Sequence, residues 1–226
     1  MKKYAVIVAG GKGLRMDNAV PKQFLPLLGK PILYHTIKAF KDAYEDIDII
    51  LVLPQDQTSY TQMVLQSFTE RIELTIVPGG ATRYHSVQNG LNMVKEESIV
   101  FVHDGVRPLV TKELIQRCFD DAIAYGSAIP AVPVSDSMRL VDGGHSKPVD
   151  RSMMRAIQTP QTFKSEILLP AFRQDYQDAF TDEATVVEHL GTSVHITEGE
   201  KSNLKITTPI DMKVAEAILE SRLEDA

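Results

Sequence analysis

A glycine-rich segment near the N-terminus carries residue types suited to phosphate chemistry. Gly10, Gly11 and Gly13 fall within four positions, and Arg15 and Lys22 follow, seven residues apart. Because glycine has no Cβ, a ligand can approach the backbone closely and meet amide N–H groups with its phosphate oxygens. Two cations nearby would neutralise a triphosphate, and we expect both to lie on a loop outside the core. A tight structural turn with solvated basic residues is the alternative.

Two familiar phosphate-binding loops do not fit this segment. The dinucleotide fingerprint GxGxxG, started at Gly11, needs a third glycine where the sequence has Met16. The Walker pattern needs Gly-Lys five residues after the first glycine, and neither Arg15 nor Met16 begins such a pair. The pattern therefore argues against an NAD-dependent oxidoreductase and favours another kind of anion-binding loop.

A second candidate site follows an apolar run farther along the chain. Asp104 and Arg107 come directly after residues 99–103, and ligands of open α/β sheets bind at the carboxyl ends of strands. The two side chains could also simply pair with each other. His103 offers no zinc spacing towards Arg107, and no histidine pair has i, i+3 or i+4 spacing, so we expect no structural metal.

Alternating patterns predict the elements that must position these residues. Short runs rich in Val and Ile, most of them continuously apolar, predict strands covered on both faces, with helices between them. This order predicts an α/β fold with a mostly parallel sheet and helices on both faces. The expected strands are 4–8, 47–53, 74–77, 99–103 and 128–134, and the expected helices are 31–43, 58–68, 82–94 and 111–125.

The strand and helix alternation breaks at residues 135–158, where Asp142-Gly143-Gly144 predicts the turn of a protruding hairpin. Helices at 165–174, 182–189 and 209–223 and a strand at 193–197 are expected after it. The hairpin segment has no apolar face of its own, yet it contains several large apolar residues that predict contact with a second subunit in a two-fold homodimer. These are Leu140, Val141, Met153, Met154 and Ile157.

Composition limits the classes of protein that remain. The chain has 226 residues, 43% of them apolar, and we expect a single domain, 1–226, with 135–158 as a dimerisation arm within it. A formal charge of −6 does not favour nucleic acid or anionic membranes as partners. The longest apolar runs are about six residues, far below the ~20 needed to span a bilayer. The single cysteine, Cys118, fits a reducing compartment, so we expect a soluble, cytoplasmic protein.

Seven motifs, in the same order, make the sequence resemble the 2-C-methyl-D-erythritol 4-phosphate cytidylyltransferase family. The resemblance covers the chain from Ala5 to the C-terminal helix and implies a Rossmann-like fold of the nucleotide-diphospho-sugar transferase type. The motifs are Ala9-x-Gly11-x-Gly13-x-Arg15-Met16 with Pro21-Lys22-Gln23; Gly79-Gly80-x-x-Arg83-x-x-Ser86-Val87-x-Asn89-Gly90-Leu91; Val102-His103-Asp104-x-x-Arg107-Pro108; Val149-Asp150-Arg151; Gln158-Thr159-Pro160-Gln161-x-Phe163; Thr181-Asp182-Glu183-Ala184; and Asn203-Leu204-Lys205-Ile206-Thr207.

The resemblance implies transfer of CMP from CTP to 2-C-methyl-D-erythritol 4-phosphate with release of pyrophosphate. It implies that Arg15, Lys22 and Lys205 stabilise charge on the α-phosphate and the leaving group. An ordinary strand-to-helix turn is the alternative for Ser86, and a solvated lysine for Lys205. The residues implied for CTP binding are Ala9, Gly10, Gly11, Gly13, Gly79, Gly80, Arg83, Ser86, Asp104 and Gly105.

For the second substrate, the sugar-alcohol phosphate, the resemblance implies contacts from Asp104, Arg107, Ser137, Arg151 and Thr159. Arg151 suits bidentate phosphate binding. In the family the arm crosses to a partner subunit, which implies that Ser137 and Arg151 serve the neighbouring site. Mg²⁺ is implied as a cofactor held mainly by CTP phosphate oxygens, with Asp104 as a possible ligand.

The sequence departs from the family pattern at several positions, among them Ser137, where the family usually has threonine. Ribitol-5-phosphate cytidylyltransferases share the glycine loop, the Asp-x-x-Arg-Pro motif and the Gln-Thr-Pro-Gln motif, so ribitol 5-phosphate is the alternative acceptor. Val149-Asp150-Arg151 favours methylerythritol phosphate. A nucleotide-binding protein of this fold without turnover is a further alternative, against which the presence of Arg15, Lys22 and Lys205 argues.

Overall fold

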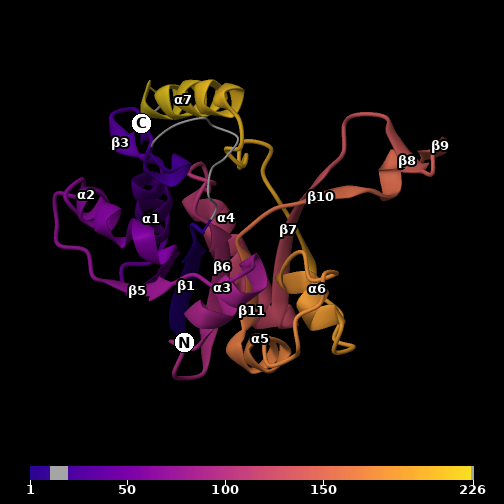
Figure 1. The fold of residues 1–226 in the computed structure, drawn as a ribbon, viewed down its shortest axis with the longest axis horizontal. Coiled ribbons are helices and arrows are strands. Elements are labelled where there is room, and N and C mark those ends of the chain that lie inside the picture. The colour runs from indigo at the N-terminus through magenta and orange to yellow at the C-terminus, as the bar shows by residue number, and fades with distance from the viewer. Residues whose placement is uncertain (11–19, 225–226) are drawn as a thin grey trace.

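The computed structural model describes residues 1–10 and 20–224. Within them, an eight-stranded sheet has the order β10-β7-β11-β6-β1-β4-β5, with β12 paired to the other edge of β7 (Figure 1). Four neighbouring strands run parallel, as predicted from their apolar runs. They are β6 (Ser98–Asp104), β1 (Lys2–Val8), β4 (Asp48–Leu53) and β5 (Leu74–Pro78).

Helices cover both faces of this sheet because successive side chains of a strand point to opposite sides. In β1, Val6 packs with one set of helices and Ile7 with the other, and both side chains are fully buried. Burying a side chain of this kind contributes about 1.5–3 kcal/mol. One face carries α3 (Arg83–Leu91), α5 (Ser165–Ala171) and α6 (Glu183–Glu188), and the other carries α1 (Ile32–Ala43), α2 (Thr61–Leu65) and α4 (Lys112–Tyr125).

The second half of the sheet mixes strand directions. β7 (Ser127–Pro133), which was predicted, runs in the same direction as the four parallel strands, whereas β11 (Gln161–Lys164), which was not predicted, lies between β6 and β7 and is antiparallel to both. β10 (Arg155–Ile157) pairs with β7 beyond the end of β11. Residues 158–160 lie between these two strands, at the end of β6 where Asp104 stands.

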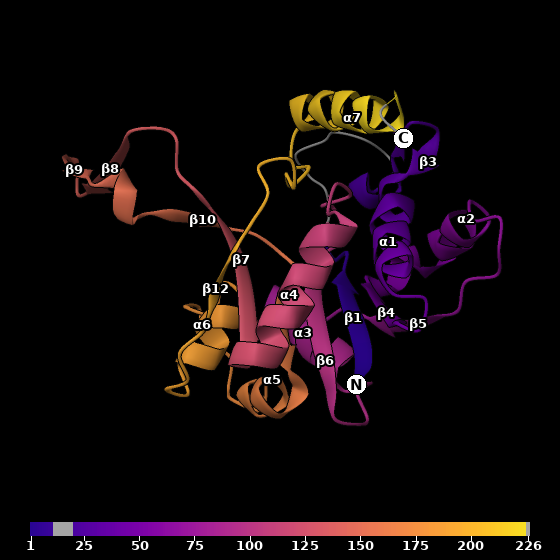
Figure 2. The same ribbon diagram turned by 180° about the vertical axis from the view of Figure 1, so that it is seen from behind.

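The predicted hairpin is present. β8 (Met138–Asp142) and β9 (His145–Val149) pair antiparallel, and Gly143 and Gly144 form the turn with φ of 51° and 82°, where glycine is favoured. A short 3-10 helix, η3 (Arg151–Met153), follows. The hairpin projects away from the sheet in both views (Figures 1 and 2). Among the described strands, β8 and β9 pair only with each other.

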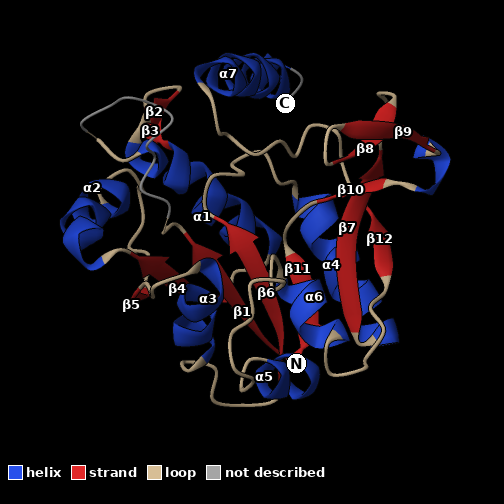
Figure 3. Ribbon diagram, turned by 45° about the vertical axis from the view of Figure 1, so that its right-hand side comes forward, coloured by secondary structure: helices blue, strands red, loops and turns tan. Residues whose placement is uncertain are grey.

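A separate apolar cluster joins the C-terminal helix α7 (Pro209–Glu224) to the rest of the molecule. α7 begins at Pro209, as predicted, and Ala215 packs with Leu27 and Ile206. Leu27 belongs to the small ladder of β2 (Pro26–Leu27) and β3 (Lys30–Pro31). Figure 3 shows α7 lying across the end of the molecule beyond the carboxyl ends of the parallel strands. No helix in the described residues is long and apolar enough to cross a membrane.

Several predicted boundaries were wrong, and the helix expected over 82–94 ends at Leu91. In place of a helix over 58–68, the chain forms a 3-10 helix, η2 (Gln55–Tyr60), and then the short α2; the Thr58 hydroxyl donates to the Gln55 carbonyl and competes with α-helical bonding. The helix expected over 165–174 ends at Ala171, one residue after Pro170. The strand expected at 193–197 is β12 (Ile196–Glu198), whose register is set by pairing of Ile196 with Ile129 of β7.

Candidate nucleotide and phosphate site

Gly10, which follows β1, lies near the glycine turn that follows β5. The Ser86 hydroxyl lies between them: a Cβ on Gly10 would stand 3.7 Å from Ser86 Oγ, and one on Gly79 would stand 3.4 Å from it. A Cβ on Gly80 would lie 2.4 Å from the Cβ of His85, so this position requires glycine. The structure therefore brings Gly10, Gly79 and Gly80 together around Ser86.

Ser86 also has a structural role in this turn. Its hydroxyl accepts a hydrogen bond from the Gly80 amide at 3.0 Å and donates one to the Thr82 carbonyl at 2.9 Å. Thr82 in turn caps α3 by accepting from the His85 amide. The contacts of Ser86 within the chain are thus those of a residue in an ordinary strand-to-helix turn, the alternative considered for it.

The ends of β1 and β6 are held close together beside these turns. The Gly105 amide donates to the Val8 carbonyl at 2.9 Å, and a Cβ on Gly105 would stand 2.9 Å from that of Ala9. Ala9 and Gly105 therefore lie side by side at the carboxyl ends of β1 and β6. Three residues of the predicted loop, Gly11, Gly13 and Arg15, lie outside the described residues.

Asp104, the last residue of β6, stands among three cations. Its Oδ2 lies 2.8 Å from Lys205 Nζ and 3.6 Å from Arg107 Nε, and its Oδ1 lies 3.4 Å from Arg83 Nη2. The Asp104 side chain is only 10% exposed, whereas that of Lys205 is 43% exposed. Burial by itself would raise the pKa of Asp104, but Arg83, Lys205 and Arg107 together hold it well below its usual range. Asp104 is therefore a carboxylate throughout the neutral range.

Arg83 connects Asp104 to a second acidic residue that the sequence did not single out. The Glu183 carboxylate, at the start of α6, is fully buried and accepts hydrogen bonds from both terminal nitrogens of Arg83. Arg83 Nη1 donates to Oε1, and Nη2 donates to Oε2 at 3.2 Å. Burial would lower the pKa of Arg83, but Glu183 and Asp104 raise it above its usual value. Arg83, the first residue of α3, thus links α3 to α6 and to the end of β6.

The segment after β12 supplies one of these cations, Lys205, and contacts a fourth cation, Lys22. Lys205 reaches Asp104 directly, and the Ile206 amide donates to the Val106 carbonyl at 2.9 Å. The Ile206 carbonyl accepts a hydrogen bond from Lys22 Nζ at 3.0 Å. Lys22 begins the short helix η1 (Lys22–Phe24) and is buried, so the expectation that it lies on a loop outside the core was wrong. Phe24 and Gln23 anchor it, because both are buried beside it.

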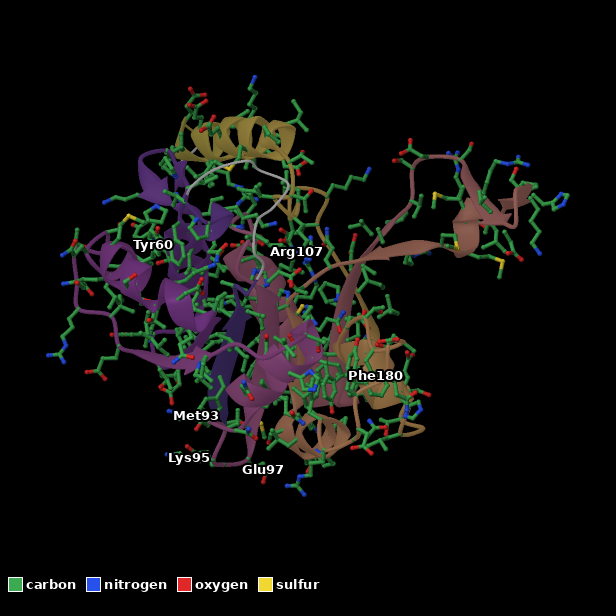
Figure 4. All side chains as sticks on the ribbon, in the orientation of Figure 1. Tyr60, Met93, Lys95, Glu97, Arg107 and Phe180 are labelled. Carbon is green, nitrogen blue, oxygen red and sulfur yellow. The ribbon has the colours of Figure 1, made fainter. Side chains whose placement is uncertain are left out.

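Thr159 also lies in the cluster, as the resemblance implied. Its Oγ1 accepts from the Asp104 amide at 3.1 Å and lies 3.0 Å from His103 Nδ1. His103 is fully buried, its Nε2 lies 3.2 Å from the Arg107 carbonyl, and burial lowers its pKa to about 4. A neutral ring therefore supports both Thr159 and the turn that carries Arg107. Arg107 lies at the end of the sheet that faces α7 (Figure 4).

Ser137 and Arg151 are the predicted residues that the structure does not bring to this cluster. Both are exposed and belong to the arm, which extends away from the sheet. The Arg151 guanidinium donates to the Ser135 carbonyl within the arm. Neither residue, among those that the structure describes, completes the site of its own chain.

At one end of the sheet, the described residues place glycines, which have no Cβ to obstruct a ligand, beside several cations. A phosphate-bearing ligand could bind there. This is the arrangement of α/β proteins that bind nucleotides and their phosphates at the carboxyl edge of the sheet. Residues 4–221 match the family model of 2-C-methyl-D-erythritol 4-phosphate cytidylyltransferase. The chain belongs to this family.

Individual relatives agree with the family model over nearly the whole chain. The 2-C-methyl-D-erythritol 4-phosphate cytidylyltransferase of Bacteroides thetaiotaomicron is 45% identical over 219 residues, which are 97% of this chain and 100% of that protein. The protein of the same name from Azobacteroides pseudotrichonymphae is 47% identical over 221 residues, covering 97% and 99%. Both names specify the methylerythritol acceptor rather than ribitol 5-phosphate.

Solved structures show the same fold. The crystal structure of 4-diphosphocytidyl-2C-methyl-D-erythritol synthase from Anaerococcus prevotii superposes with a TM-score of 0.81 at 27% identity, covering 97% of this chain and 98% of that one. The 2-C-methyl-D-erythritol 4-phosphate cytidylyltransferase of Francisella tularensis gives a TM-score of 0.79 at 29% identity, covering 96% and 99%. The predicted mostly parallel α/β sheet is thereby confirmed.

Proposed function

We propose that this protein transfers CMP from CTP to 2-C-methyl-D-erythritol 4-phosphate, giving 4-diphosphocytidyl-2-C-methyl-D-erythritol and pyrophosphate. The observation that carries the proposal is Asp104 held among Arg83, Arg107 and Lys205 beside the glycine turns. The full-length match to the family and to its named relatives supports the choice of nucleotide and acceptor.

In the proposed reaction a phosphate oxygen of the acceptor attacks the α-phosphorus of CTP. The new P–O bond forms as the bond to the bridging oxygen breaks, and pyrophosphate leaves with that electron pair. The nucleophile is already an anion, so the protein need not supply a general base. Such transfer depends on positioning and on cations that neutralise the developing charge.

We assign roles to the residues on this basis. Lys22, Lys205 and Arg15 would stabilise the α-phosphate and the leaving pyrophosphate. Arg107 and Thr159 would contact the acceptor beside Asp104. Gly10, Gly11 and Gly13, together with Ala9 and Gly105, would line the phosphates, while Gly79, Gly80, Arg83 and Ser86 would contact the cytosine and ribose.

The donor set at this edge fits a magnesium ion that arrives with the nucleotide. Among the described residues there is no group of three His, Cys, Asp or Glu side chains that could hold a metal. Asp104, already paired with three cations, is the carboxylate that would contact the ion, and the remaining ligands would be phosphate oxygens and water. The ion would supply further neutralisation of phosphate charge.

We further propose that 1–226 acts as one domain whose arm, 135–158, completes the site of a second copy in a homodimer. The exposure of Ser137 and Arg151, away from the cluster of their own chain, supports this assignment. Location in the cytoplasm stays a prediction.

One assay tests the proposed function. Pyrophosphate release is measured with CTP, Mg²⁺ and either 2-C-methyl-D-erythritol 4-phosphate or ribitol 5-phosphate, and then with ATP or GTP in place of CTP. We expect turnover with CTP and the methylerythritol acceptor and at most slow turnover in the other mixtures. Faster release with ribitol 5-phosphate would overturn the acceptor, and equal turnover with purine triphosphates would overturn the assignment of the base pocket.

A further inference from the structure

The segment that delivers Lys205 has little regular structure of its own. Residues 199–208 run between β12 and α7 as turns and coil, passing close to β10 in Figure 1. Yet the segment carries Lys205, which pairs with Asp104, and the Ile206 carbonyl, which accepts from Lys22. Contacts outside the segment must therefore fix its position, because an unsupported loop would adopt many conformations and place the Lys205 ammonium differently in each.

Gln158 contributes to that support through both ends of its side-chain amide. Its Nε2 donates to the Glu200 carbonyl at 2.8 Å and lies 3.4 Å from the Asn203 carbonyl, while its Oε1 accepts from the Glu200 amide at 3.1 Å. The Gln158 side chain thus makes paired hydrogen bonds with the backbone of residue 200, as a neighbouring strand would. A Cβ on Gly199 would stand 2.6 Å from Gln158 Oε1, so the approach also needs a glycine there.

The support point is itself rigid. Gln158 is 6% exposed, and its backbone amide donates to the Pro130 carbonyl of β7 at 2.7 Å. The next residue, Thr159, accepts from the Asp104 amide, and its own carbonyl accepts from Asn203 Nδ2 at 2.8 Å. The Asn203 carbonyl also receives Arg107 Nη1 at 2.8 Å. The segment is therefore tied to the same short stretch that contacts Asp104.

We propose that Gln158 is a positioning residue for Lys205: its amide holds the backbone of residues 199–203 so that the Lys205 ammonium is presented at Asp104 and at the α-phosphate. Gln158 touches neither substrate in this role. It acts through the backbone of Glu200 and Asn203, and it sits directly after β10, the last strand of the arm. The proposal rests on the proposed cytidylyl transfer.

The test compares Gln158→Met, which keeps the length of the side chain and removes the amide, with wild type. We expect kcat to fall about tenfold or more, because small displacements of a catalytic group cost this much, while KM for CTP changes far less. The matched control is Gln174→Met. Gln174 likewise ties two carbonyls, those of Ala171 and Val186, at 2.8 and 3.0 Å, but lies away from the cluster.

A double-mutant cycle with Lys205→Ala separates positioning from general stabilisation. If Gln158 acts through Lys205, adding Gln158→Met to Lys205→Ala lowers kcat no further. The proposal would be overturned if the fold-losses of kcat in the two single variants multiplied in the double variant. An unchanged kcat in Gln158→Met, or an equal loss of kcat in Gln174→Met, would also overturn it. If the Met variant does not fold, the same cycle is run with Gln158→Asn, which keeps the amide on a stem one methylene shorter.

A readout independent of activity accompanies the kinetics. Hydrogen–deuterium exchange of a peptide covering residues 199–206 should be faster in Gln158→Met than in wild type and unchanged in Gln174→Met. Equal exchange in all three proteins would overturn the positioning role of Gln158. A wild-type protein that releases no pyrophosphate, with the exchange difference intact, would instead count against the proposed function and leave the positioning contact standing.

Discussion

His103 and Asp104 are buried neighbours on β6, yet the histidine is neutral and the aspartate is charged in the neutral range. The His103 ring is fully enclosed and packs against Phe40 with ring centroids 5.2 Å apart, so burial lowers its pKa to about 4. Burial alone would also favour the neutral form of Asp104, but Arg83, Lys205 and Arg107 surround its carboxylate and keep it charged. The end of β6 therefore holds one fixed negative charge in the neutral range, and a substrate phosphate would meet the cations around it.

The lowered pKa of His103 predicts a pH dependence of stability. The unfolded chain takes up a proton near pH 6.5, whereas the folded ring resists it until about pH 4, so the free energy of unfolding should fall as pH drops through this window. The loss approaches about 3 kcal/mol at ~1.4 kcal/mol per unit. The charged side chains that face the ring are those of Asp104, Arg107 and Lys205.

Urea unfolding at several pH values between 7 and 4 measures this effect. His103→Asn should be less stable at neutral pH but should lose most of the pH dependence that wild type shows. His145→Asn, at an exposed position of the arm, is the control and should follow the wild-type curve. A wild-type slope retained in His103→Asn would contradict the assignment to this ring.

Lys205 should matter more for catalysis than for folding. Its side chain is 43% exposed and pairs with a carboxylate that keeps two other cations, so Lys205→Ala should change the melting temperature little. The loss of one charge contact in the transition state should lower kcat about 10²-fold or more, roughly 3 kcal/mol. Lys201→Ala, exposed in the same segment, is the matched control. Near-normal kcat in Lys205→Ala would remove this lysine from the mechanism.

Sequence could predict the charged residues of this cluster but not what fixes them. Asp104, Arg107 and Lys205 stand in short motifs beside strands, and the structure brings them together. Glu183 and Gln158 stand in two of the motifs, but the sequence predicts no role for either. Their partners lie 100 and 42 residues away in sequence, and no local pattern specifies which distant polar groups a buried side chain will meet.

At the scale of elements, α3 packs unusually close to the sheet. Gly90 is buried in the middle of this contact, and a Cβ there would lie 2.5 Å from Val6 Cγ1 and 3.0 Å from Val52 Cγ2. Both valines are fully buried and have little room to move. The glycine in the Asn89-Gly90-Leu91 motif is therefore explained by packing between helix and strands.

Gly90→Ala should destabilise the fold although alanine is the better helix former. The gain in helix propensity is about 1 kcal/mol, and overpacking of a filled core costs about 1–3 kcal/mol, so we expect a net loss or at best balance. Val6→Ala in the Gly90→Ala background should recover stability relative to the sum of the two single changes. Denaturant midpoints of the four proteins measure this coupling, and a strictly additive result would contradict direct contact.

Elements with long apolar runs were predictable, whereas β10 and β11 were not. β11 reads Gln161-Thr162-Phe163-Lys164, too short and too polar to show a period, and it becomes a strand because β6 and β7 offer it hydrogen bonds on both sides. β10 has three residues, all exposed. In both cases the pairing partner, set by the tertiary fold, decides the structure rather than the segment itself.

At the scale of the whole molecule, the arm is the feature that contacts within one chain do not explain. It exposes Leu140, Val141 and Met153 by 53%, 69% and 82% of their surface, which is costly for large apolar side chains. Ser137 and Arg151 are exposed residues of this arm, which projects away from the sheet (Figure 1). A second copy of the chain would cover the apolar side chains and place the polar ones in its own site. The hairpin itself was predictable from its Asp142-Gly143-Gly144 turn.

This assignment predicts that two inactive variants restore activity in a mixture. Lys205→Ala removes a cation from a chain's own site, and Arg151→Ala removes the residue which that chain lends to its partner. In a mixed dimer, the site on the Arg151→Ala chain has its own Lys205 and receives Arg151 from the other chain, so it is intact, while the second site lacks both. Half of the dimers are mixed after full exchange, which gives about a quarter of wild-type activity by counting in a two-fold dimer. Mass spectrometry of differently labelled chains confirms exchange, and pyrophosphate release measures recovery. No recovery in a mixture that has exchanged would place Arg151 in the site of its own chain, and a monomer in sedimentation equilibrium would discard the shared site.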